Sequence, residues 1–326
     1  MSPSSPPVLP ENAIEVRGLR KTYAASKKTP PKEALKGVDL VIPRGSMFGL
    51  LGPNGAGKST LINILAGVVN KTEGQVHIWG RDIDKEPRDA RAALGVVPQE
   101  IVADVFFTPR EALEVQAGFY GVPASERRSD ELLAALGLSD KANAYVRALS
   151  GGMKRRLMVA KALVHNPPIL ILDEPTAGVD VELRRQLWAY VRRINAEGVT
   201  VVLTTHYLEE AQELCDTIAI VNRGEVVACE PTAQLLRRLD TRNVVVTPEA
   251  PLTSAPRLAG FETALRPNGA FAVTYRTGQS SVEQVLAAVR AAGVTIKDIA
   301  TEDPDLEDVF VAMTYGDASR GDPTKD

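Results

Sequence analysis

Cysteines and long apolar runs are scarce in this sequence, and each shortage excludes a class of protein. The only cysteines are Cys215 and Cys229. They are too few and wrongly spaced for a disulfide framework or a zinc site, so we interpret them as reduced thiols of a cytoplasmic protein. No apolar run approaches the roughly 20 residues that cross a membrane. Residues 1–7 lack a positive region followed by an apolar one, and their Pro and Ser content predicts a disordered tail rather than a secretory signal.

An excess of positive charge is also missing. The formal net charge is −3 over 326 residues, which gives no electrostatic support for binding nucleic acid. Hydrophobic residues make up 44% of the chain, so a packed core is available. The length predicts one large domain or two smaller ones.

The strongest signal is a glycine loop, which consists of Gly52, Pro53, Asn54, Gly55, Ala56, Gly57, Lys58, Ser59 and Thr60. It follows an apolar run typical of a buried strand and precedes an apolar-periodic segment typical of a helix. In that context the spacing G-x-x-x-x-G-K-[ST] predicts a phosphate cradle, because the glycines let backbone N–H groups face an anion and the helix N-terminus adds positive potential. We expect Lys58 to reach the β- and γ-phosphates of a nucleotide, and Ser59 to hold Mg²⁺.

The rest of the chain alternates strand patterns with helix patterns, which predicts an α/β fold with a doubly wound sheet. Residues 14–17 predict an edge-type strand, and the continuous apolar run 169–172 predicts a strand buried on both faces. A helix is expected over about 181–196. Helical patterns over about 100–165 predict an all-helical insertion. Its basic run Lys154-Arg155-Arg156 is expected on a solvated face, with electrostatic support for bound phosphate as the alternative.

A second unit is predicted after the main domain, where strand patterns flank a helix pattern at about 282–292. We expect a disordered tail over 1–12, the main domain over 13–238, a small α+β domain over 239–316 and another disordered tail over 317–326.

Two acidic residues, Asp173 and Glu174, end the buried apolar strand. A carboxylate at that place can hold Mg²⁺ directly or through water, and Asp173 is our candidate for this role. Glu174 projects in a different direction and is our candidate for the base that orients and deprotonates an attacking water. Two surface acids that merely end a strand would look the same in isolation, but the glycine loop upstream favours the catalytic interpretation.

Together these residues resemble the ATP-binding subunits of ABC transporters over about residues 15–231. The segment Leu149-Ser150-Gly151-Gly152 matches the family's signature loop, which is diagnostic among phosphate-loop ATPases. Gln99 matches the Q-loop glutamine, Asp180 the D-loop aspartate and His206 the switch histidine. The resemblance implies a P-loop ATPase cassette with a mixed sheet and a helical subdomain, ATP and Mg²⁺ as cofactors, and ATP hydrolysis as the activity.

The resemblance also implies a role for each matching residue. Two subunits meet head to tail, so that each ATP lies between the glycine loop of one copy and the signature residues 150–152 of the other, and Asp180 counts among the nucleotide-binding residues. Gln99 would touch Mg²⁺ at the hinge to the helical insertion and His206 would contact the γ-phosphate. Tyr23 would stack on adenine.

Narrower motifs at 178–180, 205–211 and 306–310 resemble the type-2 exporter branch, which handles drugs, polysaccharides and lipids with a separate membrane-spanning subunit. The signature departs from its commonest form, because Met153 stands where a glutamine is usual, and this puts one polar contact in doubt. We therefore expect the ATP-hydrolysing motor of a two-component exporter. It would be peripheral on the cytoplasmic face of the cell membrane, paired with a permease and with a second copy of itself, and without a nucleic-acid partner.

Other functions stay open at this point. A non-transport ABC ATPase acting on ribosomes or DNA usually carries two cassettes or long coiled coils, and this sequence shows neither. A regulatory module without turnover is disfavoured by Glu174, whereas an importer motor is disfavoured only by the branch-specific motifs. The sequence gives neither the transported substrate nor, beyond those motifs, the direction of transport. For the C-terminal unit we favour a structural cap or dimer contact over ligand sensing.

Overall fold

The structure, a computed structural model, describes residues 9–25, 30–102, 104–176, 179, 181–238, 241–276, 278–302 and 305–315. Contacts divide the chain into two compact units, Met1–Thr232 and Ala233–Asp326, and each is described by itself. Of the two predicted tails, only residues 9–12 are described, and β1 already begins at Asn12. No helix within the described ranges is both long and apolar enough to cross a membrane.

The first unit contains ten strands among its described residues: β1 (Asn12–Tyr23), β2 (Lys32–Pro43), β3 (Met47–Leu51), β4 (Glu73–Ile78), β5 (Arg81–Asp82), β6 (Leu94–Val97), β7 (Ile169–Asp173), β8 (Thr200–Thr204), β9 (Thr217–Asn222) and β10 (Glu225–Pro231). Its α-helices are α1 (Lys58–Leu65), α2 (Pro87–Ala92), α3 (Pro109–Phe119), α4 (Ser129–Ala135), α5 (Gly151–Leu163), α6 (Val181–Ala196) and α7 (Leu208–Leu214), and α8 (Thr232–Arg237) spans the division.

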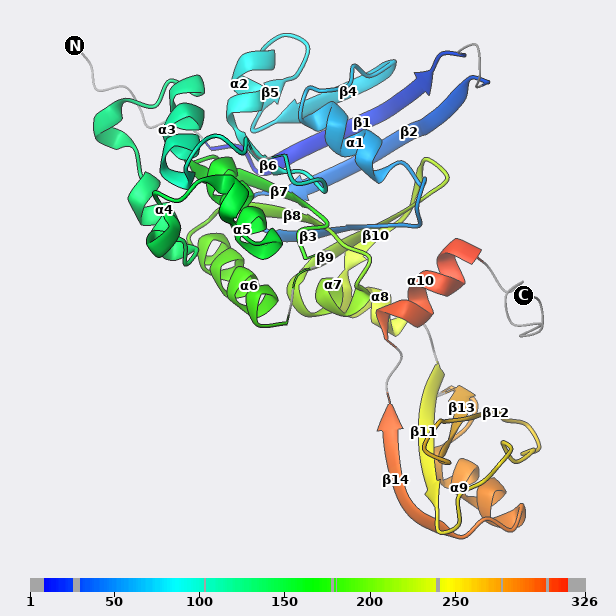
Figure 1. Cartoon of the computed structure of the whole chain (residues 1–326). Coiled ribbons are helices and arrows are strands. Elements are labelled where there is room, and N and C mark those ends of the chain that lie inside the picture. The colour runs from blue at the N-terminus through cyan, green and yellow to red at the C-terminus, as the bar shows by residue number, and fades with distance from the viewer. Residues whose placement is uncertain are drawn as a thin grey trace. The chain divides into compact units, whose positions relative to one another are not determined.

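Two sheets build this unit (Figure 1). The larger has the order β10-β9-β3-β8-β7-β6 and is parallel except for β10. The smaller is antiparallel, with the order β2-β1-β4-β5. Side chains from both sheets and from α1, among them Phe48, Leu61 and Ile78, form one buried core. The predicted α/β fold with a mixed sheet and a helical subdomain is confirmed.

Parallel pairing decides where the functional segments lie. Strands β3, β8, β7 and β6 are neighbours that run in the same direction, so their carboxyl ends meet at one edge of the sheet. The glycine loop follows β3, Gln99 follows β6, Glu174 follows β7 and His206 follows β8. Segments as far apart in sequence as Gly52 and His206 are therefore gathered at the edge where α/β sheets bind ligands.

The expectation of an edge strand at residues 14–17 is wrong. This segment belongs to β1, in which Glu15 pairs with Val41 of β2 on one side and with His77 of β4 on the other. Alternating burial along β1 reports that one face of the sheet is covered. It does not report whether the two edges of the strand are paired, so periodicity alone could not settle this point.

The helical insertion consists of α3, α4 and α5, joined by short 3₁₀ turns (green in Figure 1). Helix α3 begins with a capping box between Thr108 and Glu111, and Pro109 takes the first helical position. Helix α5 begins at the signature residues. Ser150 is its N-cap, and the Ser150 hydroxyl accepts a 3.3 Å hydrogen bond from the backbone N–H of Met153.

The second unit contains β11 (Thr241–Pro248), β12 (Glu262–Leu265), β13 (Phe271–Arg276), β14 (Ile296–Glu302), α9 (Val282–Ala291) and α10 (Leu306–Tyr315). Its antiparallel sheet has the order β12-β13-β11-β14. Side chains of β11, β13 and α9 form a separate core that includes Val244, Phe271 and Val285. The unit is therefore an α+β arrangement with its own interior.

Candidate functional site

Two glycines of the glycine loop, Gly52 and Gly57, leave no room for a side chain. Gly57 has φ 115°, and a Cβ there would lie 2.8 Å from the carbonyl oxygen of Ala34. At Gly52 an added Cβ would lie 2.1 Å from the carbonyl oxygen of Val221. Gly57 is also the N-cap of α1 and offers no capping side chain. The N–H groups of the first turn of α1 therefore have no competing side-chain acceptor at the place where an anion would bind.

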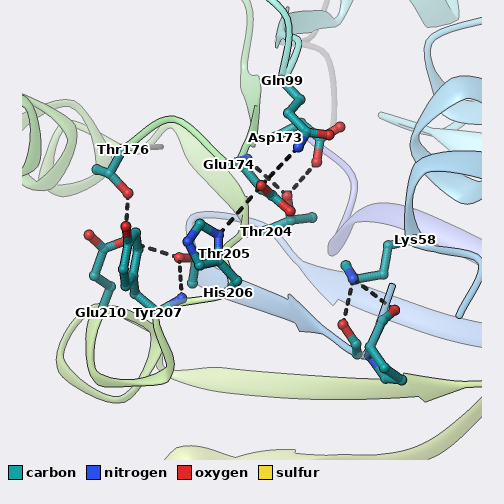
Figure 2. Close-up of polar contacts among 12 residues, drawn as sticks. Lys58, Gln99, Asp173, Glu174, Thr176, Thr204, Thr205, His206, Tyr207 and Glu210 are labelled. Atoms are coloured by element: carbon teal, nitrogen blue, oxygen red, sulfur yellow. Dashed lines mark hydrogen bonds and ion pairs between the residues drawn. The ribbon is translucent and has the colours of Figure 1, made fainter. Parts of the chain in front are cut away.

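The Lys58 side chain lies across its own loop (Figure 2). Its ammonium donates hydrogen bonds to the carbonyl oxygens of Gly52 and Pro53. Burial lowers the pKa of Lys58 below its usual 10.5, and the carboxylates of Glu174 and Asp173 oppose this change. A partly desolvated ammonium in this loop suits a polyphosphate, whose charged oxygens would replace the two carbonyl oxygens as its partners.

Thr204, at the end of β8, contacts both acidic residues at the end of β7: Asp173, its last residue, and Glu174, which follows it. Its hydroxyl donates a hydrogen bond to Oδ1 of Asp173. The backbone N–H of Glu174 donates to the Thr204 carbonyl at 3.0 Å and to the Thr204 hydroxyl at 3.1 Å. Burial raises the pKa of Asp173, the Thr204 hydrogen bond lowers it, and the charge of Glu174 raises it again. A buried carboxylate of this kind gains stability from a bound cation.

Glu174 is the point at which three motifs meet (Figure 2). Oε2 of Glu174 accepts a 3.0 Å hydrogen bond from Nε2 of Gln99 and lies 3.4 Å from Nδ1 of His206. The Glu174 backbone has φ 48°, in the left-handed region that residues other than glycine seldom adopt. Strain of this kind persists where the surroundings over-determine it, here through the paired contacts with Thr204.

One cavity collects most of the residues predicted from the sequence. Its lining consists of Tyr23, Lys32, Ala34, Asn54, Gly55, Ala56, Gly57, Lys58, Ser59, Thr60, Gln99 and Glu174. Asp173 and His206 are linked to these residues through Thr204 and Glu174. In the lining, Ser59 contributes a hydroxyl, Gln99 an amide oxygen and Glu174 a carboxylate, and Asp173 adds another carboxylate nearby. Because Mg²⁺ prefers oxygen ligands, Ser59, Gln99 and Asp173 fit the metal.

The signature residues do not line this cavity among the described residues. Ser150 and Gly151 are exposed at the start of α5, and the Ser150 hydroxyl keeps its proton free to donate, because its N-cap hydrogen bond uses only an acceptor lone pair. Asp180 lies outside the described residues.

The expectation of a solvated face at Lys154-Arg155-Arg156 is wrong for both arginines, which are 4% and 9% exposed. Arg155 donates from Nη1 to the carbonyl of Pro98 at 2.8 Å and from Nη2 to that of Gln99 at 2.7 Å. Arg156 donates to the carbonyl of Leu136 at 2.7 Å. Each guanidinium satisfies backbone carbonyls from segments distant in sequence, so the run of charges itself gave no sign of their burial.

Sequence reasoning missed three residues of this network, Thr204, Thr176 and Glu210. The first two are hydroxyl residues beside predicted motifs: Thr204 ends β8, and Thr176 lies three residues after β7. Their position beside these motifs was the one sequence feature that could have identified them. Glu210, on α7, lies within the motif 205–211, but the motif indicated no role for it, because its contact with Thr176 spans 34 residues of sequence.

Comparisons with known proteins agree with this geometry. A family model described as ABC transporter matches residues 35–177. The chain is 34% identical to the linearmycin resistance ATP-binding protein LnrL of Bacillus subtilis (strain 168), over 92% of this chain and 98% of that protein. It is 35% identical to the daunorubicin resistance ATP-binding protein DrrA3 of Streptomyces coeruleorubidus, over 94% of this chain and 97% of that protein.

A solved structure of a dimeric ATP-binding cassette, in a post-hydrolysis state with ADP and Pi, is similar at TM-score 0.62 and 30% identity. The match covers 67% of this chain and 98% of that one.

The chain belongs to the ABC transporter family and is one of its ATP-binding proteins. Its activity is ATP hydrolysis. Its similarity to these drug-resistance proteins and to the Nod factor export ATP-binding protein I of Ralstonia nicotianae (strain ATCC BAA-1114 / GMI1000), 40% identical over 69% of each chain, confirms the exporter branch that the sequence motifs indicated.

Proposed function

We propose that two copies of this chain pair head to tail and drive export through a separate membrane permease, at the cytoplasmic face of the membrane. One observation carries the pairing. The cavity at the glycine loop contains Lys58, Gln99 and Glu174, but the signature residues begin a different helix and do not line it in the described part of the chain. The exposed N-terminus of α5 and the Ser150 hydroxyl of a second copy would supply the missing donors to the γ-phosphate. The post-hydrolysis cassette similar to this chain is itself a dimer.

In this site the chain's own groups would divide the work. The glycine loop and Lys58 would bind the phosphates, and Tyr23 would hold the adenine. Mg²⁺, held by Ser59, Gln99 and Asp173, would neutralise charge on the phosphates. Glu174 would orient the attacking water and accept its proton, within reach of the switch residue His206. His206 would contact the γ-phosphate.

The stretch after Gln99 supports a docking role. Large apolar side chains are exposed in unusual density between positions 101 and 120, namely Ile101, Val102, Val105, Phe106, Phe107, Val115, Phe119 and Tyr120. Phe106 and Phe119 are 76% and 80% exposed. So many exposed apolar side chains within one short stretch of sequence favour a surface that a partner covers. We propose that the permease docks here, so that movement at Gln99 is transmitted to the transport pathway.

A mixing experiment tests the shared site. Lys58→Ala removes the phosphate grip, and Ser150→Arg obstructs the partner's site with a bulky side chain. Each homodimer then has two defective sites, whereas a heterodimer has one site with both defects and one with neither. Random mixing gives about half heterodimers, so the ATPase activity of the mixture should return to about a quarter of wild type if the sites act independently.

Dimer exchange must be verified separately. Absence of recovery despite verified heterodimers calls for a covalently linked heterodimer, in which one occluded nucleotide supports the shared site and none contradicts it. For the permease, Phe106→Glu should reduce co-purification with the membrane protein that wild type captures, while leaving basal ATPase activity intact. Unchanged co-purification would contradict docking at this stretch.

A further inference from the structure

Glu210, in the first turn of α7, is a buried charge to which the activity of the family gives no role. The residue is 7% exposed. Its Oε2 accepts hydrogen bonds from the hydroxyls of Thr176 at 2.9 Å and Thr205 at 3.1 Å, and its Oε1 lies 3.3 Å from Nε of Arg184 (Figure 2 shows the two threonines). Removing a carboxylate from water is costly unless it is paired and hydrogen-bonded, so this arrangement is specific.

The two threonines lie on the two loops that leave the catalytic edge of the sheet. Thr176 is two residues after Glu174 and directly precedes residues 177–180. Thr205 directly precedes His206, and its hydroxyl also accepts a 3.0 Å hydrogen bond from the backbone N–H of Tyr207. A single carboxylate oxygen thus fastens the segment after β7 to the segment after β8.

A second chain of contacts runs from Glu210 to the same histidine. The guanidinium of Arg184, paired with Glu210, lies over the ring of Tyr207 at 4.7 Å. The Tyr207 ring in turn packs against that of His206, with the ring centroids 4.0 Å apart and tilted by 40°. The His206 side chain is 52% exposed, so its position depends on these neighbours and on the backbone that Thr205 anchors.

We propose that Glu210 is a positioning residue that holds His206 in register with Glu174. The distance that depends on it is the 3.4 Å between Nδ1 of His206 and Oε2 of Glu174. The inference rests on the proposed roles of Glu174 and His206 in hydrolysis. It adds that a buried carboxylate outside the glycine loop keeps His206 and Glu174 at this separation.

The test compares Glu210→Gln with Glu209→Gln, a matched control one residue earlier on the exposed side of α7. Glutamine keeps the shape of Glu210 but removes the charge and replaces one acceptor oxygen by a donor, so either Arg184 or the threonines lose their partner. We expect kcat for ATP to fall about 10- to 100-fold in Glu210→Gln, as for a misplaced catalytic group. The Kd for ATP should stay within about twofold, because the glycine loop and Lys58, which would bind the phosphates, are unchanged, and Glu209→Gln should behave as wild type.

A second pair of variants keeps the test decisive if Glu210→Gln does not fold. Thr205→Val removes the hydroxyl and should lower kcat in the same way, whereas Thr205→Ser keeps the hydroxyl and should restore turnover. Unchanged kcat in a folded Glu210→Gln or Thr205→Val protein would overturn the inference. A serine variant as inactive as the valine variant, or a loss confined to ATP affinity, would do the same.

Parallel measurements on Glu174→Gln and His206→Ala separate this inference from the proposed function. If those two variants retain full turnover, the assigned roles of Glu174 and His206 are wrong. If they lose turnover while Glu210→Gln and Thr205→Val do not, the roles stand and the positioning inference alone is overturned.

Discussion

Nε2 of Gln99 donates a 3.0 Å hydrogen bond to Oε2 of Glu174, although 75 positions separate the two residues in the sequence. Gln99 leads from β6 toward the helical insertion, and Arg155 of that insertion binds the Gln99 carbonyl at 2.7 Å. The proposed catalytic carboxylate is therefore connected to the start of α5 through a single residue. A displacement of the insertion would reach Glu174 directly through this contact.

Glu174→Gln should bind ATP and Mg²⁺ but lose hydrolysis. The amide preserves the shape of the side chain and removes the base, which is worth about 10²- to 10⁴-fold in rate. A stable ATP-bound dimer should accumulate and be visible by size-exclusion chromatography beside the ATPase assay. Turnover close to wild type would assign the base to another residue.

Thr204→Val should lower both stability and ATPase rate. Thr204 is fully buried, and without its hydroxyl Asp173 loses its hydrogen-bond partner at a cost of about 1–3 kcal/mol in the free energy of unfolding. Because Glu174 is anchored to the same hydroxyl, kcat should fall by about tenfold or more. Thr204→Ser is the matched control and should restore both quantities; urea unfolding and steady-state kinetics measure them. Equal behaviour of the valine and serine variants would show that the hydroxyl has no such role.

Truncation after Arg238 should leave ATP affinity unchanged. The residues that line the nucleotide cavity all belong to the first compact unit, and β11–β14 with α9 have a core of their own. The fragment should bind ATP within about twofold of the full chain, as isothermal titration would show, because no phosphate-binding group is removed. Loss of binding by a fragment that is still folded, as judged by circular dichroism, would mean that the second unit contributes to the site.

Alkaline pH should destabilise the protein through Cys215. Burial raises the pKa of this thiol from 9.0 to about 12. The folded-state pKa is the higher one, so the unfolded chain releases the proton first. The stabilising contribution is complete below pH 9.0 and is lost as pH rises toward about 12. In Cys215→Ala the fall in the free energy of unfolding over this pH range should be smaller than in wild type, as urea titrations would measure. Parallel pH curves for the two proteins would contradict this account.

Local spacing accounts for the part of the structure that was predictable. The strand–loop–helix order around Lys58, the buried β7 and the bounds of α6 follow from patterns that a few consecutive residues carry. The short helices α2 and α7 were missed, because six or seven residues hold less than two full periods of a helical pattern.

Contacts between distant segments account for what the sequence could not reveal. The burial of Arg155 depends on the carbonyls of Pro98 and Gln99, and that of Glu210 on hydroxyls after two separate strands. A charged residue with such partners has the same local sequence pattern as one exposed to solvent. Only the assembled sheet edge distinguishes the two cases.

The left-handed backbone of Glu174 has a consequence for anyone who engineers this protein. A glycine at this position would relax φ 48° and relieve strain on the order of 1 kcal/mol. A screen that rewards heat resistance alone would therefore favour replacing the residue on which turnover is proposed to depend. At this position, selection for thermal stability opposes selection for catalysis. A directed-evolution experiment must therefore measure both properties together.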